Sequence, residues 1–221
     1  MRWFHPELGC VPPAEFIPLA ERCGLMPELG EWILRTACAQ NKAWLNRGLP
    51  PIRMAVNLSP RQFLKGDLAE TVIRVLRDTA LPAHLLEVEL TEAAIIDHPT
   101  EVGKVLDRLH TVGVRIAIDD FGTRQSNLMA LRHLPIDALK IDHSFIESLG
   151  QAFQEKDIVI AMIHLAHALG MTAVAEGVER EQQVEVLRSV GCDEIQGYLI
   201  GRAVPPEDWE ALFDRQLLPA A

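Results

Sequence analysis

Long hydrophobic runs are missing from this sequence. No stretch approaches the roughly 18 consecutive apolar residues that a membrane-spanning helix needs, although hydrophobic residues fill 48% of the 221 positions. The first residues include Arg2, Trp3 and His5, and they lack the continuous apolar core of a secretory signal peptide. We therefore expect a cytoplasmic location and no membrane segment in this chain.

Cysteine is scarce, and its spacing points to no metal or redox centre. The four cysteines are Cys10, Cys23, Cys38 and Cys192, and they form no C-x-x-C pair. Such pairs are typical of zinc sites and of redox motifs, so neither is expected here. We expect reduced thiols that behave as small apolar side chains.

Positive charge is in deficit as well, with 21 Lys and Arg residues against 31 Asp and Glu residues and a formal net charge of −10. Proteins that bind duplex nucleic acid neutralise many phosphates with basic side chains, so we expect no such partner. A small phosphate ligand is compatible with this charge, because clustered carboxylates can hold metal ions that in turn hold phosphates.

The sequence does contain a regular alternation of short apolar runs with longer helical patterns. The runs are dense in Val, Ile and Leu, which is typical of strands that are covered on both faces of a parallel sheet. No linker separates them, so residues 1–221 are expected to form a single domain. Six strands are expected, at residues 52–57, 85–90, 114–119, 138–142, 171–176 and 193–198.

Amphipathic patterns predict helices between these strands. One is expected over residues 59–80, with Ser59 and Pro60 as the N-cap and the first helical residue. Another is expected over residues 155–171, with Gly170 suited to the left-handed position after a helix. The repeated order of strand and helix predicts a parallel sheet, either doubly wound or closed into a barrel.

Polar residues at the carboxyl ends of the strands favour the barrel. In a (β/α)8 barrel these ends meet on one rim, where active sites are built, whereas in an open sheet they spread along an edge. We therefore expect a TIM-like α/β barrel that is incomplete at the N-terminus, with about its first two strands missing. The polar strand ends are Asn57, Glu89, Asp119, Asp120, Lys140, Glu176 and Gln196.

The oxygen atoms at these strand ends predict a site for Mg²⁺ or Mn²⁺. Glu89, Asp119 and Asp120 offer hard carboxylate ligands, and Asn57 adds an amide oxygen, whereas zinc would prefer His and Cys. Two such metals about 4 Å apart can clamp a phosphodiester for in-line attack by water.

Lys140 and Glu176 would complete this site. Lys140 could hold or polarise the attacking water, and Glu176 could join the second metal or accept a proton. Each acid alone has a simpler interpretation as the N-cap of the next helix, and Asn57 could form an Asx-turn. A lysine in an apolar strand needs a carboxylate partner, however, and adjacent aspartates need a counter-charge. Together, the polar ends of six strands favour a functional site.

Six motifs, in this order, resemble the EAL domain of bacterial cyclic-di-GMP phosphodiesterases: VNLSPRQ, VELTEAAI, IAIDDFGT, LKIDHSFI, AVAEGVE and DEIQGYLI. The resemblance runs from the first residues to the end of the chain. It implies a barrel of the EAL type that hydrolyses cyclic di-GMP to linear pGpG by two-metal in-line attack of water, with Mg²⁺ or Mn²⁺ as cofactor.

The resemblance also implies which residues bind the metals. Asn57, Glu89 and Asp119 resemble the ligands of the first ion. Asp119, Asp120 and Glu176 resemble the ligands of the second, with Glu176 also taking part in catalysis.

Further roles follow from the same resemblance. Lys140 would contact the nucleophilic water, and Gln196 would assist at the reacting centre. Arg2 and Asn57 would contact the substrate. Glu92 would stabilise the loop that follows the paired aspartates.

Two departures from the family pattern predict reduced activity. The family loop DDFGTGYSS reads DDFGTRQSN here, with Arg124 and Gln125 in place of a glycine and an aromatic residue. The Glu-Ala-Leu motif would end just before Arg2 and Trp3, so we expect a truncated chain that lacks the motif glutamate, a ligand of the first metal. The chain is then a weak or inactive phosphodiesterase. The alternative is a degenerate EAL module that acts as a non-catalytic cyclic-di-GMP receptor or binds a protein partner.

A barrel without its first strands would leave strand edges bare near residues 52–57 and 193–198. We expect these edges to be covered by a homodimer or another oligomer, or by rearranged N-terminal residues.

Overall fold

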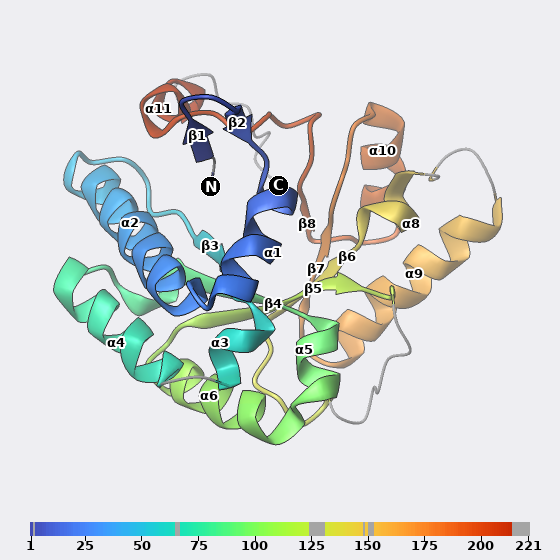
Figure 1. The fold of residues 1–221 in the computed structure, drawn as a ribbon. Coiled ribbons are helices and arrows are strands. Elements are labelled where there is room, and N and C mark those ends of the chain that lie inside the picture. The colour runs from blue at the N-terminus through green and yellow to red at the C-terminus, as the bar shows by residue number, and fades with distance from the viewer. Residues whose placement is uncertain (2, 65–66, 124–130, 148, 150–152, 214–221) are drawn as a thin grey trace. The chain divides into compact units, whose positions relative to one another are not determined.

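The computed structural model describes residues 1–221 except for 2, 65–66, 124–130, 148, 150–152 and 214–221 (Figure 1). The chain divides into two compact units. The first contains Met1–Ile116 with Met129–Pro135, and the second contains Ala117–Leu128 with Ile136–Ala221.

The first unit begins with a hairpin that the sequence patterns did not predict. Strands β1 (Trp3–His5) and β2 (Gly9–Val11) pair in antiparallel fashion. The Nδ1 atom of His5 accepts hydrogen bonds from the backbone N–H groups of Glu7 (3.2 Å) and Leu8 (3.3 Å), which closes the turn. Strands of three residues are too short to show an alternating pattern, so periodicity could not reveal them.

Helices α1 (Pro13–Cys23) and α2 (Met26–Asn46) follow the hairpin. Asn41, a fully buried residue of α2, donates hydrogen bonds from Nδ2 to the carbonyl oxygens of Ile52 (3.0 Å) and Leu85 (3.4 Å). These two carbonyls lie in the segments that enter the next two strands. Asn41 therefore anchors α2 to both strands, since buried polar groups stabilise a fold only when they are hydrogen-bonded.

Strands β3 (Met54–Asn57) and β4 (Leu86–Thr91) form the parallel pair of the first unit. The register places Asn57 beside Glu89, at the carboxyl ends of both strands. A 3₁₀ turn at Ala83–Leu85 leads into β4. Three side chains of β4 are fully buried, which explains its apolar sequence: Leu86, Val88 and Leu90.

Two helices, rather than the single helix expected over 59–80, connect β3 to β4. They are α3 (Pro60–Leu64) and α4 (Leu68–Thr79). Helix α3 begins at Pro60, so Ser59 and Pro60 hold the expected N-cap and first helical positions, and the Ser59 hydroxyl donates to Oε1 of Glu21 in α1 at 2.7 Å. Asp67 caps α4 by accepting a backbone N–H three residues later at 2.9 Å. The prediction of one helix was wrong because this aspartate starts a second one.

Helices α5 (Glu92–Asp97) and α6 (Pro99–Thr111) complete the first unit. Helix α4 packs against α2 on one side and against α6 on the other, and the three lie side by side in Figure 1.

In the second unit the parallel strands pair in chain order. Strand β5 (Arg115–Phe121), whose residues from Ala117 onward belong to this unit, pairs with β6 (Ala138–Ile141). Strand β7 (Thr172–Ala175) pairs with β6 and with β8 (Glu194–Ile195).

The helices of the second unit follow its strands. They are α8 (His143–Glu147), α9 (Phe153–Ala168), α10 (Glu181–Ser189) and α11 (Pro206–Phe213). Helix α9 packs on β6 and β7. Gly170 has a φ of +76°, which confirms that it occupies the left-handed position after α9.

Six parallel strands are therefore present where the sequence predicted them, and helices follow β3, β4, β6, β7 and β8. Among the described residues, β3 pairs with β4 and β8 with β7, and neither has a second strand beside it. An open parallel α/β sheet of this kind is consistent with an incomplete (β/α)8 barrel. No helix in the described part of the chain is both long and apolar enough to span a bilayer.

Candidate functional site

The paired aspartates lie near the carboxyl end of β5, directly before its last residue, Phe121. Ile116, Ala117 and Ile118 are fully buried, whereas Asp119 is half-buried and Asp120 is exposed. The apolar run thus places the strand in the interior, and two carboxylates lie near its carboxyl end. Such ends carry the active sites of parallel α/β folds.

A register shift in β5 brings both carboxylates together. Ile118 pairs with Leu139, but Phe121 pairs with Ile141, so β5 contains one more residue than β6 between these points. Asp120 has a φ of +55°, a left-handed conformation that is uncommon for a residue other than glycine. Backbone strain of this kind persists where the surrounding structure enforces it, and it gathers at functional sites.

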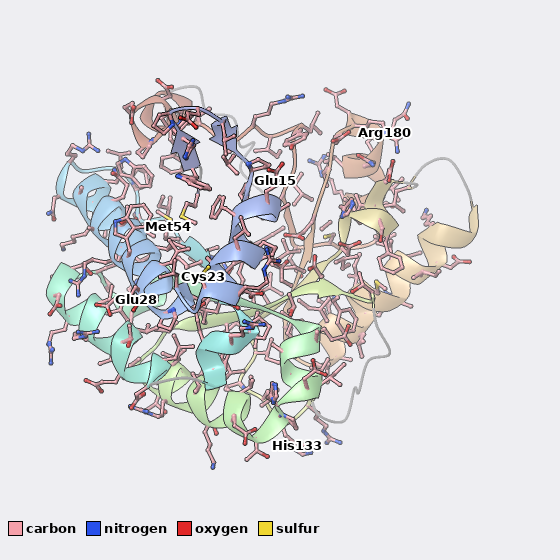
Figure 2. The ribbon with its side chains drawn as sticks, viewed as in Figure 1. Glu15, Cys23, Glu28, Met54, His133 and Arg180 are labelled. Atoms are coloured by element: carbon pink, nitrogen blue, oxygen red, sulfur yellow. The ribbon has the colours of Figure 1, made fainter. Side chains whose placement is uncertain are left out.

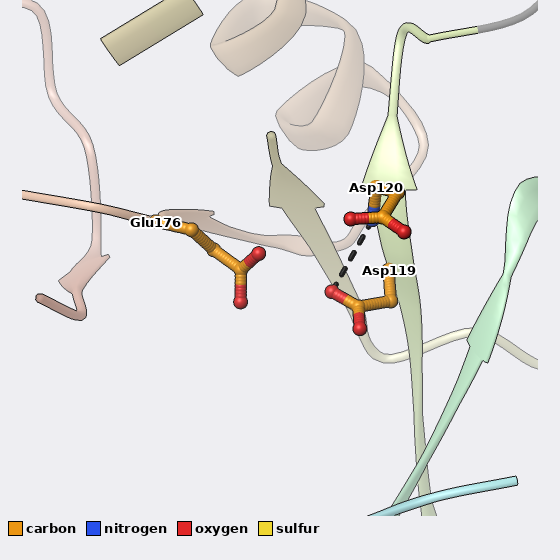
Figure 3. Close-up of side chains that lie close together, drawn as sticks. All are labelled: Asp119, Asp120 and Glu176. Carbon is orange, nitrogen blue, oxygen red and sulfur yellow. Dashed lines mark hydrogen bonds between the residues drawn. The ribbon is translucent and has the colours of Figure 1, made fainter. Parts of the chain in front are cut away.

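Hydrogen bonds hold this turn. The backbone N–H of Asp120 donates to Oδ1 of Asp119 at 3.2 Å, the bond drawn in Figure 3. The hydroxyl of Thr123 donates to the carbonyl oxygen of Asp120 at 3.0 Å.

Glu176 supplies the third carboxylate from the end of β7. Its backbone N–H donates to the carbonyl oxygen of Ile141 at 3.1 Å, which continues the ladder between β6 and β7. Figure 3 shows its side chain extending toward Asp119 and Asp120. One carboxylate oxygen from each of the three acids lies within 4.8 Å of the others, a separation that allows them to hold one metal ion.

Lys140 provides the counter-charge for this cluster. Its ammonium group is 2.6 Å from Oε1 of Glu176 and 3.4 Å from Oδ1 of Asp119, and its side chain is only 5% exposed. A buried lysine is tolerated when its charge is paired and hydrogen-bonded. These two ion pairs explain why a lysine stands within the apolar strand β6.

Asp142 belongs to the same cluster and was not among the predicted site residues. It is buried, and it accepts hydrogen bonds from the backbone N–H (3.0 Å) and the hydroxyl (2.5 Å) of Ser144. Partial burial, and then the negative charges of Asp119 and Asp142, raise the pKa of Asp120 above its ordinary value. The cluster therefore carries more negative charge than Lys140 balances, which favours a bound cation.

A second pair of predicted residues meets within the first unit. Nδ2 of Asn57 donates to Oε2 of Glu89 at 2.8 Å, and Glu89 is 4% exposed. Glu92, expected to stabilise a loop, is buried at the first position of α5.

The remaining predicted residues are placed differently. Gln196 follows β8 with its side chain exposed, and its backbone N–H donates to the carbonyl oxygen of Ala175 at 2.8 Å. Arg2, Arg124 and Gln125 lie outside the described residues.

The ligand set fits Mg²⁺ or Mn²⁺. Asp119, Asp120 and Glu176 present only carboxylate oxygens, and these hard ligands suit such ions. A bound cation would neutralise the negative charge of Asp119 and Asp142 around Asp120.

Comparisons with known proteins agree with this arrangement. A family model described as "EAL domain" matches residues 1–203. The bifunctional diguanylate cyclase/cyclic di-GMP phosphodiesterase MucR of Pseudomonas aeruginosa is 42% identical over 208 residues, covering 94% of this chain and 30% of that protein. The cyclic di-GMP phosphodiesterase NbdA of the same organism is 40% identical over 205 residues, covering 93% of this chain and 26% of that protein.

The solved structure of the PaMucR phosphodiesterase in complex with c-di-GMP matches the fold with a TM-score of 0.90 at 41% identity. The match covers 94% of this chain and 84% of that chain, and it confirms the α/β architecture of the EAL type. The chain spans about a quarter to a third of the length of the two curated relatives. By the family match and these identities, the chain belongs to the EAL domain family, whose members include cyclic di-GMP phosphodiesterases.

Proposed function

We propose that this chain hydrolyses cyclic di-GMP to linear pGpG. The observation that carries the proposal is the cluster of Asp119, Asp120 and Glu176 around Lys140, in a chain of the EAL family. Two relatives are named as cyclic di-GMP phosphodiesterases, and a third comparison is a complex with c-di-GMP. The family match extends through both compact units, which supports a single EAL-type domain over residues 1–221.

Divalent metal would be held by the carboxylates. Asp119, Asp120 and Glu176 are proposed for one ion, and the family resemblance assigns Asn57, Glu89 and Asp119 to another. When bound, Mg²⁺ or Mn²⁺ lowers the pKa of a ligated water and stabilises negative charge on a phosphodiester.

The chain's own residues handle charge and protons at this site. Lys140 presents N–H donors between Glu176 and Asp119, where they would orient an attacking water. The carboxylate of Glu176, 2.6 Å from the ammonium group of Lys140, is placed to accept a proton from that water. For Gln196, Arg2 and Asn57, the roles at the reacting centre and on the substrate rest on the resemblance, as does the role of Glu92 beside the loop.

The activity is proposed to be weak, because Arg124 and Gln125 stand where the family loop has a glycine and an aromatic residue. Assembly into a homodimer or larger oligomer is proposed because β3 and β8 each pair with one described strand only. A monomeric mass by light scattering would contradict the assembly.

Incubation with cyclic di-GMP and Mn²⁺, followed by chromatography of the nucleotides, tests the function. Slow formation of pGpG that disappears in Asp119→Asn and persists in Asp157→Asn, a change on the exposed face of α9, supports it. Calorimetric binding of the nucleotide without hydrolysis would replace it by the receptor function. Neither binding nor hydrolysis would overturn both.

A further inference from the structure

Gln183 is a buried amide that joins two segments of the second unit. It is 1% exposed and lies in the first turn of α10. Its Oε1 accepts hydrogen bonds from the backbone N–H groups of Glu179 and Arg180, both at 2.9 Å. Its Nε2 donates to the carbonyl oxygen of Ile146 at 2.7 Å. One side chain thus holds the segment before α10 against the last turn of α8.

The two joined segments begin at residues of the candidate site. Glu176 lies three residues before Glu179. Asp142 lies two residues after Lys140, and α8 begins at the next residue. The ion pair between Lys140 and Glu176 therefore joins the starts of the same two segments that Gln183 connects further along the chain.

Two further contacts reinforce this connection. Gly177 has a φ of +72°, and a Cβ added to it would lie 2.6 Å from Cβ of His143, so the backbone after β7 lies directly against the start of α8. The guanidinium of Arg180, labelled in Figure 2, donates to the carbonyl oxygens of Glu147 (2.6 Å) and Leu149 (3.1 Å).

A helix cap alone does not explain Gln183. In a capping box, the side chain three residues after the N-cap accepts the N-cap backbone N–H, and glutamate serves as well as glutamine. That function accounts for the bonds that Oε1 accepts. It leaves out the bond that Nε2 donates to Ile146, which only an amide can form.

We infer that Gln183 is a positioning residue that fixes the Glu176 carboxylate beside Lys140 by tying the segment after β7 to α8. The inference rests on the proposed function, because it concerns the metal-binding geometry of the same site. Substitution of a residue that orients a metal ligand is expected to change the metal affinity, although the residue does not contact the ion.

The test substitutes Gln183→Glu in the full chain. The carboxylate retains both bonds from the backbone N–H groups, but it loses the donor to Ile146 and places negative charge against that carbonyl. Gln182→Glu is the matched control, since it makes the same chemical change at the exposed neighbouring position of α10. Mn²⁺ affinity by titration calorimetry and amide hydrogen exchange at Glu176 are measured in both variants.

We expect the Mn²⁺ dissociation constant to rise about 10- to 100-fold in Gln183→Glu, with faster exchange of the Glu176 amide. Gln182→Glu should match the unchanged chain in both measurements. Equal affinity in the two variants would overturn the inference and leave the proposed function intact. If the unchanged chain binds no Mn²⁺, the proposed function fails. Exchange at Glu176 then decides the inference alone: faster exchange in Gln183→Glu supports it, and equal exchange overturns it.

Discussion

The charge on Asp120 should destabilise the metal-free protein. Its carboxylate is partly desolvated and faces Asp119 and Asp142, which together raise its pKa. When folding raises the pKa of an acid, the ionised acid lowers the free energy of unfolding of the protein. This destabilisation is fully present at pH values above the folded pKa. Replacing Asp120 by Asn removes the charge at neutral pH. Asn also tolerates the left-handed φ of +55°, so the backbone conformation is retained.

The size of the effect follows from the separation of the charges. The carboxylate oxygens lie within 4.8 Å of one another, and two unit charges at that limit repel by about 0.9 kcal/mol in water and by about 3.5 kcal/mol at an effective dielectric constant of 20. Asp120 is exposed, so solvent screening places it near the lower value, and Lys140 offsets part of the field. A gain of about 1 kcal/mol corresponds to a rise in Tm of about 2 to 4 °C for a chain of this length.

Metal should reverse the order of stability. A ligand that binds only the folded state stabilises it by about 2.7 kcal/mol at 100 times its Kd, which exceeds the gain expected from the substitution. Loss of a direct ligand should weaken Mn²⁺ binding at least as much as loss of a residue that only hydrogen-bonds to a ligand, which is about 10- to 100-fold. Asp120→Asn is therefore expected to have the higher Tm in EDTA and the lower Tm in Mn²⁺.

Differential scanning calorimetry in EDTA, and again in Mn²⁺ at 100 times the Kd of the unchanged chain, measures both effects. Asp157→Asn, a change on the exposed face of α9, serves as the control for the loss of one negative charge. An Asp120→Asn variant that melts below the unchanged chain in EDTA would refute the reasoning. So would an equal rise in Tm on addition of Mn²⁺.

Three further predictions concern stability. Lys140→Met leaves the half-buried carboxylates of Asp119 and Glu176 without their counter-ion, so the metal-free chain should lose about 1 to 3 kcal/mol in urea unfolding, and Mn²⁺ should restore part of it. Gly177→Ala should cost about 1 to 3 kcal/mol, more than Gly191→Ala, because both have positive φ but only Gly177 lies against a neighbouring side chain. Burial alone would raise the pKa of Asp193, yet a backbone N–H and His167 lower it. The stability it contributes is present above its unfolded pKa and is lost as the pH falls through its lower folded pKa, so Asp193→Asn should flatten the acid side of a stability profile measured by circular dichroism.

The sequence predicted the strands and the polar residues at their ends because both depend on local patterns. Dense apolar runs mark strands that are covered on both faces, and parallel strands end on the same side. Lys140 was informative for the same reason, since an ion within an apolar run requires partners, and it has them in Asp119 and Glu176.

Other features depend on geometry that alternation cannot show. Asp142 looks like an ordinary helix cap in the sequence, and it does accept the backbone N–H of Ser144, so its place beside Asp120 was not visible. The contacts of Gln183 link positions that are 37 residues apart. The break between α3 and α4 was missed because Asp67 follows a helical pattern that continues on both sides.

The extra residue in β5 has an evolutionary consequence. Ile118 and Phe121 pair with positions of β6 that are one step closer together, so deletion of a single codon for Asp119 or Asp120 would restore a regular ladder. Such a deletion would remove the left-handed backbone position together with one carboxylate. The proposed metal site would then keep two of its three carboxylates. A lineage of this fold could thus pass from enzyme to inactive binding module through one short deletion, and the reverse path would require inserting an acid at this one point.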